Sequence, residues 1–167
     1  MALHLTATRL WKHLPPEERL LATTAFFREP PPELAGVALG ALVKARNLRP
    51  QAARSLAPDA QARILATVLD PGEPLSQGLL VSLHLAHRRP LLGAFLDALG
   101  LPHEDGVLKD EADAQGPVPI EKARAALAAL GAFPAGQVRT YLNTLWLQDP
   151  ERWAAVEAVS EEIPDRA

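Results

Sequence analysis

The sequence contains no cysteine. This absence excludes disulfides, thiolate-bound zinc, iron–sulfur clusters and cysteine nucleophiles. A metal site in this chain would have to be built from histidine and carboxylate side chains. The lack of cysteine also fits a reducing compartment, so we expect the protein to be cytoplasmic.

Long apolar runs and strand-forming residues are also scarce. No apolar run approaches the ~18 residues of a membrane span. Residues 1–14 do not contain a charged region followed by a long apolar region, as a secretory leader would. We therefore expect no membrane association. Aromatic residues make up 5% of the chain, and apolar and polar residues do not alternate over any sustained stretch. An all-α fold is therefore expected.

Signatures of nucleophilic and nucleotide chemistry are missing as well. The serines are Ser55, Ser76, Ser82 and Ser160, and none lies in a Gly-x-Ser-x-Gly elbow. No glycine-rich loop follows a strand, as a nucleotide site of the doubly wound type requires. Enzymatic activity is not favoured, and no cofactor is expected.

Prolines divide the chain into helix-sized segments. Proline is favoured at the first position of a helix and blocks continuation of the preceding one. The spacing of the prolines and the apolar periodicity predict about ten helices. Two of them begin at Pro74 and Pro90, and the others are predicted at residues 3–13, 16–28, 32–46, 50–56, 59–69, 119–130, 135–148 and 151–160. Asn47 is expected to end its helix in a left-handed conformation.

Short turns between these helices predict a succession of antiparallel hairpins. Two arrangements stay open: a solenoid with TPR-like or HEAT-like stacking, or an irregular helical bundle, because the hairpins share no repeat signature. We expect residues 1–167 to form a single domain. Residues 74–106 are the most apolar stretch and are predicted to be its central hairpin and core.

Residues 103–118 are acidic, have no helical stripe and are predicted to be a long loop. Asp105 and Gly106 form a turn dipeptide, with a positive φ expected at the glycine. The acidic turn is expected to pair with Arg88 and Arg89, which would fix the loop onto the hairpin. Residues 161–167 are predicted to be a flexible tail.

Histidines and acids near residues 84–105 suggest one alternative function. His84 and His87 lie three residues apart and could share a helix face, while His103 follows in a turn beside Glu104 and Asp105. Convergence of the three histidines would build a metal-dependent hydrolase site. The simpler interpretation, a polar helix end, is favoured because His-x-x-His is a common chance pattern.

A basic tract suggests a second alternative. Its cations are Lys44, Arg46, Arg49, Arg54 and Arg63. A helical array could bind nucleic acid through such a tract, but the chain has a net charge of −3 and no aromatic residue lies among these cations. A nucleic-acid partner is therefore disfavoured, and a solvated helix face or a protein contact is preferred.

Aromatic residues complete the candidates. Trp11, Trp146, Trp153 and Tyr141 belong to residue types that are enriched at contact hot spots, although their helical spacing favours core packing. Trp153 stands out because it lies on the last predicted helix, which has the fewest neighbours to cover it.

These observations predict a non-catalytic interaction or scaffold module built of helical hairpins, from a GC-rich bacterial genome. The partner would be a protein or a second copy of the chain. The candidate partner-binding residues are His84, His87, Arg88, Arg89, His103, Glu104, Asp105, Lys44, Arg46, Arg49, Arg54 and Trp153.

Overall fold

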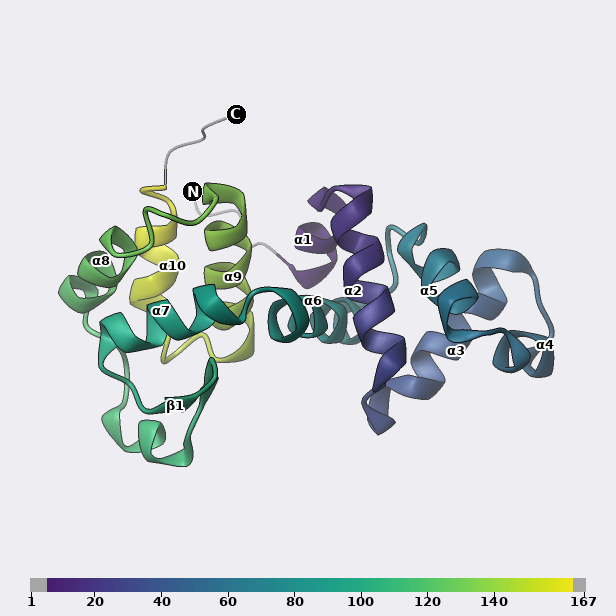
Figure 1. Cartoon of the computed structure of the whole chain (residues 1–167), viewed down its shortest axis with the longest axis horizontal. Helices are drawn as coiled ribbons and strands as arrows, with labels where there is room; N and C mark the ends of the chain where they lie inside the picture. The colour runs from purple at the N-terminus through teal and green to yellow at the C-terminus, as the bar shows by residue number, and fades with distance from the viewer. Residues whose placement is uncertain (1–5, 164–167) are drawn as a thin grey trace. The chain divides into compact units, whose positions relative to one another are not determined.

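The computed structural model describes residues 6–163, except for the side chains of residues 113 and 114. Within this range the fold is all-α, as predicted, with one two-stranded hairpin (Figure 1). The elements are α1 (Ala7–His13), α2 (Pro16–Arg28), α3 (Pro32–Arg46), α4 (Pro50–Ser55), α5 (Pro58–Ala66), α6 (Glu73–His87), α7 (Arg89–Leu99), β1 (His103–Glu104), β2 (Val107–Leu108), the 3-10 helix η1 (Asp110–Gln115), α8 (Ile120–Ala128), α9 (Ala135–Gln148) and α10 (Ala154–Ser160). None of the described helices combines the length and apolar character that crossing a bilayer requires.

Prolines begin the helices as the sequence predicts. Helices α2, α3, α4, α5 and α7 have proline in their first two positions and no side-chain cap. Asn47 ends α3 with φ 50° and ψ 46°, which confirms the predicted left-handed stop. The helix predicted at 3–13 begins at Ala7, and residues 1–5 lie outside the described part.

The contacts within the chain define two compact units, and the boundary between them in the sequence falls between His87 and Arg88. Helices α1–α6 belong to the first unit and α7–α10 to the second. The stretch predicted as one central hairpin is thus divided between two cores: α6 buries its leucines in the first unit and α7 in the second. A single domain would require both units to unfold in one cooperative transition, so the expectation that residues 1–167 form one domain stays a prediction.

The first unit packs helices that are distant in sequence. Helix α2 lies mainly against α5 and α6, and α1 lies against α6 (Figure 1). The core is aliphatic apart from Trp11 and Phe26, with Leu42, Leu65 and Leu79 fully buried. A solenoid would place the main contacts between successive hairpins, so repeat stacking is not confirmed here.

Side chains from distant positions satisfy helix ends in the first unit. The Trp11 indole Nε1 donates to the Val68 carbonyl at 2.8 Å. The Arg19 guanidinium donates to the carbonyls of Ala66 at 3.1 Å and Leu14 at 2.6 Å, at the ends of α5 and α1. Backbone carbonyls at the end of a helix lack an intrahelical donor, so the bonds to Ala66 and Leu14 satisfy acceptors that their helices leave open, and the Trp11 bond ties α1 to the segment after α5.

The second unit is built around an aromatic cluster. The Phe95 ring of α7 contacts Tyr141 of α9 edge to face, with ring centroids 5.8 Å apart, and lies 6.2 Å from the Trp153 ring. All three side chains are buried. Helix α10 packs on α8 and α9, and α8 also packs on α7.

Two sequence predictions for this unit are corrected. Residues 103–118 are not a structureless loop, because they contain the β1–β2 hairpin and η1. Residues 161–163 are not a free tail: Ile163 is buried, and its carbonyl accepts a bond from Arg139 at 2.8 Å. The rest of the predicted tail, residues 164–167, lies outside the described residues.

Glu73 makes the stability of the first unit depend on acid pH. Its carboxylate accepts backbone N–H bonds from Ala7 at 3.0 Å and Thr8 at 2.9 Å, at the start of α1. Desolvation alone would raise the pKa of Glu73, but the bonds from Thr8, Ala7 and Thr6 outweigh it and lower the pKa. This stabilisation is present above the unfolded-state pKa of about 4.3 and is lost as pH falls through the lower, folded-state pKa.

We therefore expect Glu73→Gln to lower the free energy of unfolding at pH 7 by about 0.5–1 kcal/mol, in the lower part of the range for helix caps because the carboxylate is exposed. The deficit should shrink in acid, where the wild-type carboxyl is protonated too. Urea denaturation of the wild type and Glu73→Gln at neutral and acid pH measures this difference in the free energy of unfolding. Glu29→Gln, which changes an exposed glutamate, is the control. A deficit that does not change with pH would contradict the assignment.

Tyr141 makes the second unit sensitive to alkali. Burial raises the pKa of Tyr141, the single tyrosine of the chain, above its usual value of about 10. The folded unit keeps the proton at a pH where the unfolded chain loses it. The stabilisation is complete below pH ~10 and is lost as pH rises toward the folded-state pKa.

Tyrosinate absorbance near 295 nm should therefore appear together with loss of the helical circular dichroism signal, not before it. Tyr141→Phe should make the decline of stability above pH ~10 less steep, because one proton-linked group is gone. Ionisation of Tyr141 near pH 10 with full helical signal would show that the ring is not buried in solution.

Candidate interaction groove

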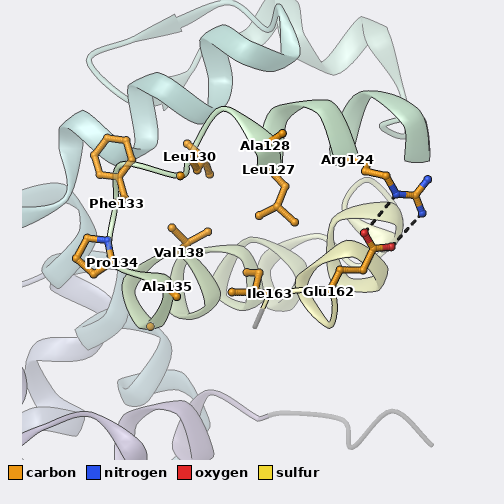
Figure 2. A pocket seen from close by; sticks show the side chains of 12 residues that line it. Arg124, Leu127, Ala128, Leu130, Phe133, Pro134, Ala135, Val138, Glu162 and Ile163 are labelled. Atoms are coloured by element: carbon orange, nitrogen blue, oxygen red, sulfur yellow. Dashed lines mark hydrogen bonds and ion pairs between the residues drawn. The ribbon is translucent and has the colours of Figure 1, made fainter. Parts of the chain in front are cut away.

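An open groove in the second unit is the clearest candidate site. It has a volume of about 760 Å³. It lies between α8, the turn after α8, α9 and residues 162–163 (Figure 2). Its lining is mostly apolar and consists of Leu127, Ala128, Leu130, Gly131, Phe133, Pro134, Ala135, Gly136, Val138, Ile163, Arg124 and Glu162.

The walls arise from the way α8 and α9 divide their residues between core and surface. In α8, Ala123 and Ala126 are fully buried, whereas Leu127 is only partly buried and points into the groove (Figure 2). Val138 of α9 and Ile163 face Leu127 from the other side (Figure 2). The groove is therefore a gap between α8 and α9 that residues 162–163 border.

The turn between α8 and α9 closes one end of the groove. Phe133 donates its backbone N–H to the Leu130 carbonyl at 3.0 Å, and Pro134 precedes α9. The Phe133 side chain is half-buried in this turn. An aromatic ring and a proline ring thus stand side by side at this end (Figure 2).

An ion pair marks the other end. The Arg124 guanidinium donates from Nε to Glu162 Oε2 at 3.3 Å and from Nη2 to Oε1 at 3.0 Å. The pair raises the pKa of Arg124 and lowers that of Glu162. Both side chains are about half exposed, at 48% and 46%, so water screens the pair and competes for both partners.

This arrangement is suited to binding. Arg124 and Glu162 are the ionisable residues among those that line the groove, and they are occupied with each other. Apolar walls with one charged end would hold an amphipathic ligand through burial and orient it through charge.

The histidines of the hydrolase alternative occupy different environments. His84 is buried in α6, and His87 is exposed at the end of that helix. His103, in the second unit, places Nε2 2.7 Å from Asp97 Oδ1 and accepts the Gly106 N–H at Nδ1 over 3.1 Å. Residues 6–163, as far as the structure describes them, contain no group of three His, Asp or Glu side chains that could hold a metal ion.

The acidic turn is held as the sequence predicts. Asp105 and Gly106 have φ values of 50° and 87° and join β1 to β2. Arg89 donates to the Asp105 carbonyl at 2.8 Å and lies 3.4 Å from its carboxylate, which confirms the expected pairing at Arg89. Glu104 is exposed on β1, and Arg88 is partly buried where it precedes α7.

The basic tract is exposed but spread over the first unit. Lys44 lines a groove with Val37 and Asp70, whereas Arg54 lines another with Phe27 and Leu39. Arg63 lines a third groove, and Arg46 and Arg49 are exposed around the end of α3. Each of these three grooves holds one cation of the tract.

Trp153 is a core residue. Its side chain is 2% exposed, and its ring packs beside Phe95. The contact role that the sequence suggested for Trp153 is therefore replaced by a packing role, the same role that its helical spacing had favoured.

The sequence analysis did not identify the groove. Leu127 and Val138 fit the apolar stripes of their helices and looked like ordinary core residues. The one local signal was Phe133, an aromatic residue in a turn directly before a proline, where no helical stripe accounts for it. Ile163 had been assigned to the tail.

Gly106 offers a test of the turn beside α7. A Cβ at this position would lie 2.7 Å from the Leu92 Cβ, in a backbone conformation that side chains disfavour. We expect Gly106→Ala to lower the free energy of unfolding by about 1–3 kcal/mol. Gly100→Ala is the matched control, because its φ is also positive but nothing lies within 4 Å of the added Cβ. Equal losses in thermal denaturation would show that the contact with Leu92 is unimportant.

Comparisons with known proteins add no relative. No family model, no curated protein and no solved structure matches the chain. The geometry of the described residues is therefore the basis for assigning a function.

Proposed function

We propose that the chain is a non-catalytic protein-interaction module, and that the groove of the second unit receives an apolar segment of a protein partner. The observation that carries the proposal is the mostly apolar lining of the groove, with the partly buried Leu127 on one side, the buried side chains of Val138 and Ile163 on the other, and charge only at one end. The absence of cysteine supports a cytoplasmic setting.

A short helix is the ligand shape that suits these walls. Helices that dock into grooves present apolar side chains at positions i, i+3, i+4 and i+7, which form one stripe. Each leucine-sized side chain that becomes fully buried contributes about 1.5–3 kcal/mol. Two or three such anchors would offset the cost of ordering a short segment, which gives modest affinity.

The two alternatives from the sequence have less support. Hydrolysis would need metal ligands that converge, and His103 already uses both ring nitrogens in bonds to Asp97 and Gly106. Nucleic-acid binding would need a continuous basic stripe, whereas Lys44, Arg54 and Arg63 line separate grooves.

Two matched variants of α8 test the proposal. Ala128 lines the groove and Ala125 does not, although both are exposed on α8. The probe is a capped 14-residue helical peptide of Leu, Ala and Gln with leucines at i, i+3, i+4 and i+7. We expect Ala128→Gln to weaken binding about tenfold, or ~1.4 kcal/mol, because its side chain occupies the groove. Ala125→Gln should bind like the wild type.

Isothermal titration calorimetry measures the affinities, and a scrambled peptide of the same composition is the negative control. Amide chemical shifts should change at Leu127, Val138 and Ile163 when the ordered peptide is added. Absence of binding to the wild type, or equal binding of the scrambled peptide, would contradict the proposal.

A further inference from the structure

We draw no further inference here: the strongest candidate, the groove between α2 and α5 where Leu20 and Leu69 are exposed, carries nothing, because nothing in the part of the chain that the structure describes shows what covers it, and Arg19, one of the two arginines that line it, already donates to the carbonyls of Leu14 and Ala66.

Discussion

The structure depends on burial of one face of each short helix. Its helices run from 6 residues in α4 to 15 in α3 and α6, lengths at which an isolated helix is marginal in water. Proline at the start of many of them fixes where a helix begins but supplies no side-chain cap. Distant side chains such as Arg19 and Glu73 satisfy ends that the helices cannot satisfy themselves, so local structure and tertiary packing stabilise each other.

Local features were predictable from the sequence because their causes are local. Proline and periodicity give α3 and α9 with the expected ends, and Asn47 and Gly106 adopt the expected positive φ. The pairing of α2 with α5 and α6 was not predictable, because an apolar stripe does not name the helix that covers it. For the same reason, the leucines around residues 79–99 fit one core or two equally well, and the structure divides them.

The candidate site shows the same limit. The pairing of Arg89 with Asp105 follows from a cation near an acidic turn, and the sequence predicted it. The groove could not be found this way, because periodicity assigns Leu127 and Val138 to apolar faces without showing that a gap remains between those faces. Ile163 reaches the wall from the segment after α10, where Arg139 of α9, 24 positions away, donates to its carbonyl and the Ile163 N–H donates to the Ser160 carbonyl.

The groove lies beside helix faces that pack into the core of the second unit. Ala123 and Ala126 are small and buried where α8 packs on α7 and α10, and Leu127 remains partly exposed at the edge of this contact. Residual apolar surface of this kind favours association. The Arg124–Glu162 pair places the only ionisable side chains of the groove lining at one end, where each already has a partner. A half-exposed ion pair contributes little to folding, because water screens both charges.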